Sequence, residues 1–181
     1  MRVTAEFLKE KMACTEGYRY VSEKKWLGLN DVEFIKNLMA DKKYDWANWL
    51  IVRVMEKKQY LAYAIFAAEQ VYPLWAKKYP KEAATWRNWV DDGCPASAAR
   101  AAYAAYAASS TDATRAAYAA ADAASSTDAT RAAACATRAA ACAAYAAADA
   151  ARATYATRAA AKEEMQIKIL NYGLSLLEST K

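Results

Sequence analysis

The chain of 181 residues contains no histidine. Histidine is the side chain that most often acts as a general base near neutral pH, and it is the commonest ligand of transition metals in proteins. The carboxylates show no paired arrangement typical of acid–base catalysis, and the sequence has no phosphate-binding loop, dinucleotide fingerprint or metal-ligand cluster. These absences argue against an enzyme, a bound cofactor and a metal site.

Cysteine is scarce, and no two of the four cysteines have the CxxC spacing. Cys135 and Cys142 would lie two helical turns apart, about 10 Å by helix rise, which is too far for a disulfide between them. Free thiols suit a reducing compartment, and we expect the cytoplasm of a bacterial host. Without a histidine to activate them, both cysteines are predicted to be small packing residues and not nucleophiles.

Long uninterrupted hydrophobic runs are also missing. Arginines and aspartates punctuate the alanine-rich half, so the sequence predicts no membrane span and no membrane partner. The first residues lead into a charged amphipathic helix and do not resemble a signal peptide. Although the net charge is +5, we expect no long nucleic acid as a partner.

Glycine and proline are absent from 96 to 172, and most of this stretch is alanine. Alanine is the strongest helix former and the smallest side chain after glycine, so helices of this stretch can pack with their backbones close together. All six tryptophans precede residue 90 and are predicted to be core residues, with Trp86 and Trp89 facing the core from one helix. The predicted fold is all-α, a helical bundle or short α-solenoid of about eight helices. It would have a Trp/Lys-rich part over 1–94 and an Ala-rich part over 95–181, in one continuous domain.

Capping residues give the predicted helix boundaries in the first part. Thr4 caps a short helix over 4–12 and Asn30 caps the next helix, because both side chains suit the N-cap position. Gly17 and Gly28 are interpreted as breaks in the connection between these two helices. Further helices are predicted from Asp45, from Tyr60 to Pro80, and over 81–91.

An eleven-residue string, AASSTDATRAA, occurs at 107–117 and again at 123–133. Each copy carries serine and aspartate three residues apart, which is a helix-start signature of the capping-box kind. The repeat therefore predicts two breaks, with helices near 95–108, near 111–124 and from 127 onward. Another break is expected near Asp149, before an amphipathic final helix.

After the second repeat the sequence has a period of seven residues. Its larger side chains are alternately four and three residues apart, a 4-and-3 spacing that places them along one face of a helix. This stripe consists of Arg131, Cys135, Arg138, Cys142, Tyr145, Asp149 and Arg152. In one interpretation the stripe faces water and keeps an alanine bundle soluble, with Asp149 close enough to pair with Arg152. In the other, the stripes of several helices converge on a cavity or a subunit interface.

The second interpretation predicts a ligand site lined by arginine and tyrosine. Arginine forks suit phosphate oxygens, and both side chains stack on bases. Six arginines and no lysine between 96 and 161 favour this interpretation. The candidate ligand-binding residues are Arg100, Tyr103, Arg115, Tyr118, Arg131, Arg138, Tyr145 and Arg152.

Three segments resemble a known family. They are YDWANWLIVR at 44–53, QYLAYAIFAAEQV at 59–71, and KEEMQIKIL at 162–170, with an alanine-rich tract before the last. Together they resemble a family of alanine-rich immunity proteins (immunity-five-like) that is common in phages and bacteria. The resemblance implies a neutralising role against a toxin or, in a phage, against a host defence. It brings no catalytic residues.

Three functions follow as hypotheses. The first is a non-catalytic protein of phage or immunity type that sequesters a small anionic, nucleotide-like defence signal in an Arg/Tyr-lined pocket. The second is an immunity protein that neutralises a protein toxin or defence effector by direct binding. The third is an ice-binding or structural helical protein, which the irregular spacing of the threonines disfavours. Extensive alanine surfaces also predict a homo-oligomer.

Overall fold

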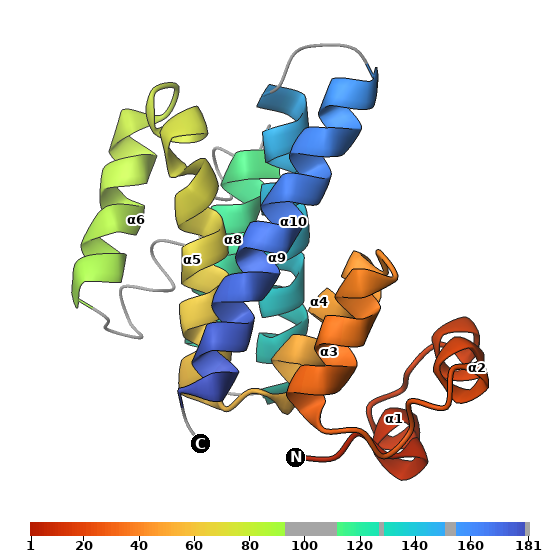
Figure 1. Ribbon diagram of the computed structural model, residues 1–181. Coiled ribbons are helices and arrows are strands. Elements are labelled where there is room, and N and C mark those ends of the chain that lie inside the picture. The colour runs from red at the N-terminus through yellow and green to blue at the C-terminus, as the bar shows by residue number, and fades with distance from the viewer. Residues whose placement is uncertain (93–111, 127–128, 151–154, 180–181) are drawn as a thin grey trace.

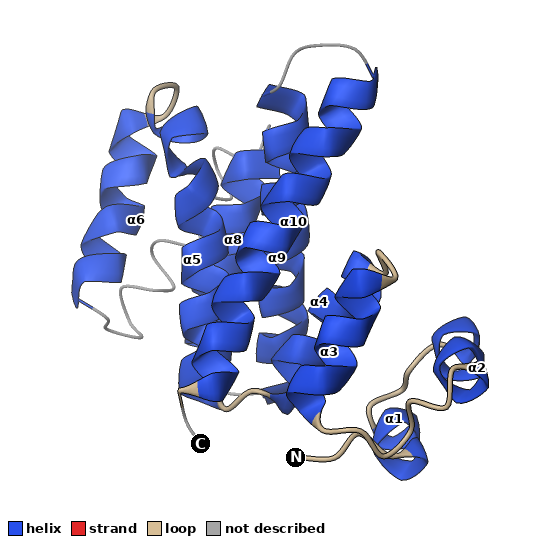
Figure 2. Ribbon diagram, viewed as in Figure 1, coloured by secondary structure: helices blue, strands red, loops and turns tan. Residues whose placement is uncertain are grey.

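The computed structural model describes residues 1–92, 112–126, 129–150 and 155–179 (Figure 1). Every regular element in these ranges is a helix, as Figure 2 shows, and the predicted all-α class is confirmed. The helices are α1 (Ala5–Glu10), α2 (Thr15–Glu23), α3 (Asp31–Ala40), α4 (Tyr44–Val54), α5 (Lys57–Ala76), α6 (Pro80–Asp92), α8 (Asp112–Ser125), α9 (Ala129–Ala150) and α10 (Tyr155–Glu178). The helix predicted over 95–108 lies outside the described residues.

Helices α5, α8, α9 and α10 lie side by side and form the centre of the molecule (Figure 1). Helix α5 packs against α8, α9 and α10 at once, which is the arrangement of a bundle and not of a solenoid. Helices α3 and α4 cover one side of this bundle through α9 and α10, and α6 packs on α5 at the other side. Helices α1 and α2 lie beyond α3 (Figure 1).

Alanine supplies the packed surface of α8 and α9, as the sequence predicts. Each of these helices buries a set of alanines completely, and the fully buried ones include Ala116, Ala117, Ala119, Ala120, Ala132, Ala136, Ala139 and Ala143. A methyl group lets neighbouring helix axes approach closely, so the contact between α8 and α9 runs along the whole pair. The buried area per residue is small, and stability depends on the length of this contact.

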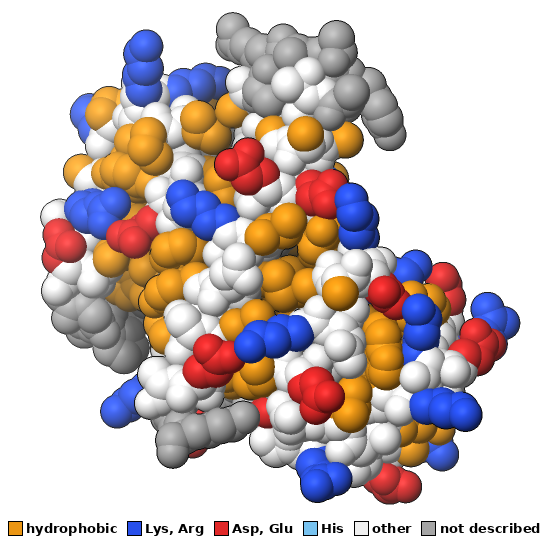
Figure 3. Space-filling view, in the orientation of Figure 1, with side chains coloured by type: hydrophobic (Ala, Val, Ile, Leu, Met, Phe, Trp, Pro, Cys, Tyr) orange, Lys and Arg blue, Asp and Glu red, His pale blue; other side chains and the backbone are white. Residues whose placement is uncertain are grey.

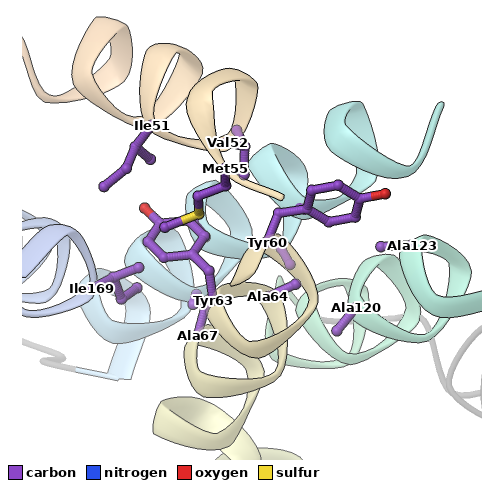
Figure 4. Close-up of a cluster of buried hydrophobic side chains, with 14 of the residues drawn as sticks. Ile51, Val52, Met55, Tyr60, Tyr63, Ala64, Ala67, Ala120, Ala123 and Ile169 are labelled. Atoms are coloured by element: carbon purple, nitrogen blue, oxygen red, sulfur yellow. The ribbon is translucent and has the colours of Figure 1, made fainter. Parts of the chain in front are cut away.

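Larger side chains fill the core between α4, α5, α6 and α10. Figure 4 shows the ring of Tyr63 between Ile51 of α4 and Ile169 of α10. Tyr63 is completely buried, and its hydroxyl donates to Oδ1 of Asn48 over 2.9 Å. The Asn48 amide in turn donates to the backbone oxygen of Thr137 over 3.1 Å, which joins α4, α5 and α9 by hydrogen bonds.

The tryptophans are divided between the core and its edge. Trp86 and Trp89 of α6 are 0% and 2% exposed, so their predicted core position is confirmed. Trp26, Trp46 and Trp49 were also predicted as core residues, but they are only half-buried and pack against the edge of the core.

Both predicted N-caps of the first part are confirmed. The Thr4 hydroxyl accepts from the backbone N–H of Phe7 over 3.2 Å, and the Asn30 side chain accepts from the N–H of Glu33 over 2.9 Å. The break expected near Asp149 is also confirmed, because α9 ends at Ala150 and α10 begins at Tyr155.

Two boundary predictions are wrong. Gly17 does not mark a break, because residues 15–23 form α2. Helix α2 approaches α4 at this glycine, where a Cβ would lie 3.7 Å from the Trp46 ring in ordinary contact and 3.2 Å from Sγ of Cys14. Pro80 does not end the preceding helix; α5 stops at Ala76, and Pro80 opens α6, where a missing N–H costs nothing.

No helix in the described ranges combines the length with the apolar character that a membrane crossing requires. This finding agrees with the prediction of no membrane span.

Candidate functional site

The predicted arginine stripe lies along the contact between α8 and α9. Asp122, near the end of α8, pairs with Arg131, near the start of α9, and the beginning of α8 faces the middle of α9, so the two helices run antiparallel. We call the exposed side of this contact the α8–α9 face. It consists of Asp112, Arg115, Tyr118, Asp122, Arg131, Cys135, Arg138 and Cys142.

Asp122 is the centre of one cluster on this face. Nη2 of Arg131 donates to Oδ1 of Asp122 over 3.1 Å, and the thiol of Cys135 donates to Oδ2 over 3.1 Å. Burial, followed by the hydrogen bond to Asp122, raises the pKa of Cys135 to about 11. Cys135 is therefore a protonated thiol at neutral pH and no nucleophile, which agrees with the packing role predicted for it.

Cys142 is the second thiol of the stripe, and it is buried as well. Burial raises its pKa, while the guanidinium groups of Arg115 and Arg138 act in the opposite direction. These opposing effects show that both arginines lie close enough to Cys142 to interact with it. Cys142 is thus a small buried residue beneath two cations.

Arg115 and Arg138 differ in their partners. Arg115 is 61% exposed and its Nη1 lies 3.2 Å from Oδ1 of Asp112, one turn earlier on α8. Arg138 is exposed and makes no ion pair with any residue that the structure describes. An ion pair between exposed side chains contributes only about 0–1 kcal/mol, so Arg115 can exchange its carboxylate for another anion at little cost.

Tyr118 lies beside the two arginines of α9. Burial and the carboxylate of Asp122 raise the pKa of its hydroxyl, whereas Arg131 and Arg138 lower it. The phenol is consequently neutral at physiological pH and lies near both guanidinium groups. A hydroxyl and two guanidinium groups in one neighbourhood offer several hydrogen-bond donors to an anion.

The C-terminal part of the stripe, from Tyr145 to Asp149, interacts with α10. Tyr145 is 50% exposed, and Nζ of Lys162 on α10 lies 4.1 Å from the centre of its ring. Asp149 pairs with Arg158 of α10, and Arg152, the partner that the first interpretation predicted, lies outside the described residues. The structure therefore brings Arg115, Tyr118, Arg131 and Arg138 together, but places Tyr145 against another helix.

Three of the predicted ligand residues, Arg100, Tyr103 and Arg152, lie outside the described residues. Sequence reasoning missed the two aspartates of the face as partners of arginine. Asp112 was interpreted as a capping residue, and Asp122 was not singled out. The sequence did contain a signal for the pair of Asp122 and Arg131. Asp122 precedes Arg131 by nine residues, with a predicted helix break between them. The two side chains can therefore meet only if the two helices fold back on each other.

The described part of the chain contains no group of three or more cysteine, aspartate or glutamate side chains that could hold a metal ion. On the side of the molecule seen in Figure 3, acidic and basic side chains alternate and neither sign forms one patch. Comparison with family models, with curated proteins and with solved structures found no match to this chain.

Proposed function

We propose that this protein is a non-catalytic binding protein of immunity type, which sequesters a small anionic, nucleotide-like defence signal on the α8–α9 face. Arg138 supports this proposal most directly. It is exposed, it has no ion pair within the described ranges, and it shares the neighbourhood of Tyr118 with Arg131. A phosphate at this position would receive charge-assisted hydrogen bonds from two guanidinium groups.

The surroundings of these arginines suit a protein that binds a ligand without catalysing a reaction. Asp122 holds Arg131, and buried alanines hold the helices, so the cations are positioned before a ligand arrives. Positioning in advance lowers the entropy cost of binding. Both cysteines of the face are protonated at neutral pH, so neither supplies a nucleophile.

Replacing Arg138 with alanine is expected to reduce bound ligand at least about tenfold, because a charge-assisted hydrogen bond contributes about 1.5–3 kcal/mol. The measurement is mass spectrometry of small molecules released by denaturing protein purified from bacteria with active nucleotide-signalling defences. Arg19→Ala is the matched control, since Arg19 is exposed on α2 and makes no ion pair with a described residue. Equal amounts of a phosphate-bearing molecule in both variants would contradict the proposal.

One observation favours the second candidate, direct binding of a protein toxin or effector. Arg115 and Arg131 are 61% and 64% exposed on the outside of a helix pair, a surface that a protein partner can cover. In that case the released fraction holds no phosphate-bearing molecule, and Arg138→Ala weakens a protein complex. The homo-oligomer expected from the sequence stays a prediction, which sedimentation of the purified protein tests.

A further inference from the structure

An apolar pocket lies between α1, α2, α3 and α4, and Thr137 of α9 closes it. Its volume is about 300 Å³, at the lower end of the range for small-molecule sites. Buried side chains from each of these four helices form its walls, among them Leu8, Val21, Phe34, Leu38 and Leu50. The rings of Trp46 and Trp49 complete it, and exposed Met12 and Cys14 lie at its edge.

A polar hollow of about 350 Å³ adjoins this pocket, and the two share Asp45 and Trp46 in their linings. Three lysines and two carboxylates line the hollow, and Glu163 pairs with one of these lysines. The shared wall at Trp46 means that one molecule can occupy both spaces, with an apolar end in the pocket and a polar end in the hollow.

The lysines of the hollow are not equally available. Lys42 pairs with Glu163 over 3.0 Å, whereas Lys43 and Lys162 make no ion pair with the residues that the structure describes. Nζ of Lys43 lies 4.9 Å from the centre of the Trp46 ring, directly at the shared wall. The ammonium group of Lys43 also lies 5.0 Å from the centre of the Tyr20 ring and interacts electrostatically with Asp41, so it is a cation at the shared wall without a direct ion pair.

We propose that this paired space binds a fatty acid, with its single acyl chain in the apolar pocket and its carboxylate against Lys43. Burying the chain removes apolar surface from water at about 25 cal/mol per Å². The carboxylate of the fatty acid stays in the polar hollow, so binding does not require its complete desolvation. Asp45, whose carboxylate accepts from Nε2 of Gln166 over 3.0 Å, faces the same hollow and would disfavour a second negative charge on the ligand.

Calorimetric titration with decanoate, below the concentration at which it forms micelles, tests the proposal on the full chain. Decanol and decylammonium have the same chain with a neutral and a positive head. We expect one decanoate per chain, bound more tightly than decylammonium. Lys43→Gln should weaken decanoate about five- to tenfold, as loss of one charge-assisted contact predicts, and should leave decanol unchanged. Lys58→Gln, at an exposed lysine of α5, is the matched control and should change neither.

Two further measurements locate the ligand. Ala13→Leu places a larger side chain in the lining and should abolish binding of decanoate and decanol alike, with circular dichroism confirming the fold. Decanoate should also slow alkylation of Cys14 at the pocket edge, read by peptide mass spectrometry. Absence of decanoate binding, equal binding of decylammonium, or full binding by Lys43→Gln would overturn the proposal. None of these results bears on the α8–α9 face, which uses other residues.

Discussion

Replacing Trp86 with alanine is expected to lower the free energy of unfolding by about 3–5 kcal/mol, the range for removal of a large aromatic side chain from a core. Trp86 is completely buried and joins three helices. Its ring centre lies 5.6 Å from that of Tyr72 on α5, and its Nε1 donates to the backbone oxygen of Ala117 on α8 over 3.2 Å. The rings of Tyr72 and Trp89 on the other sides are held in the same cluster, and the facing alanines of α8 have only methyl groups, so the cavity would be filled only in part.

Urea denaturation followed by circular dichroism at 222 nm measures this change. Trp86→Phe is the matched control, since it keeps an aromatic ring and loses the hydrogen bond to Ala117. We expect that variant to lose about 1–2 kcal/mol, a hydrogen bond of about 1 kcal/mol plus a small cavity. A Trp86→Ala protein within 1 kcal/mol of the parent on the same scale would show that α6 does not contribute to the main core.

The second large effect is expected at Gly173 in α10, where alanine should destabilise the protein by up to about 2 kcal/mol. A Cβ at this position would lie 2.6 Å from Cδ1 of Ile51 and 2.7 Å from a ring carbon of Tyr63. The Tyr63 ring cannot move aside easily, because it is fully buried and its hydroxyl is bonded to Asn48. Overpacking costs about 1–3 kcal/mol, which outweighs the gain of about 1 kcal/mol from the better helix propensity of alanine.

Gly17→Ala is the matched control, because a Cβ there meets its nearest atom at 3.2 Å and that atom is the Cys14 sulfur. We expect that variant to be neutral or slightly more stable. Ile51→Val removes the very atom that lies closest to a Cβ at Gly173. If the clash is the cause, the double variant loses less stability than the two single changes together. Additive losses, or a stabilised Gly173→Ala protein, would contradict this account.

Local signals in the sequence were sufficient for most of the helices. The side chains of Thr4 and Asn30 accept hydrogen bonds from backbone N–H groups three residues later. A window of three or four residues is therefore enough to predict where these helices start. The alanine tract likewise predicts helix and close packing on propensity alone. Gly17 was misread because its role depends on Trp46, which lies 29 residues away in the sequence and becomes a neighbour only after folding.

The candidate sites were predictable to different degrees. The 4-and-3 spacing placed Arg131, Cys135 and Arg138 on one side of a helix, and the structure agrees. The spacing could not show that Tyr145 faces α10, because the direction of a helix face depends on which neighbours surround it. The apolar pocket was not predicted at all, since its walls come from five helices and the positions of Trp46 and Trp49 in the sequence do not show that they line the same cavity.

The alanine contact between α8 and α9 has a consequence for heat capacity. Unfolding raises the heat capacity in proportion to the apolar surface it exposes and lowers it in proportion to the polar surface. These two helices bury methyl and peptide groups instead of large apolar side chains, so their unfolding adds comparatively little heat capacity. The curve of stability against temperature is therefore less strongly bent than that of a leucine-rich bundle with the same midpoint and unfolding enthalpy, and cold denaturation is shifted to lower temperature.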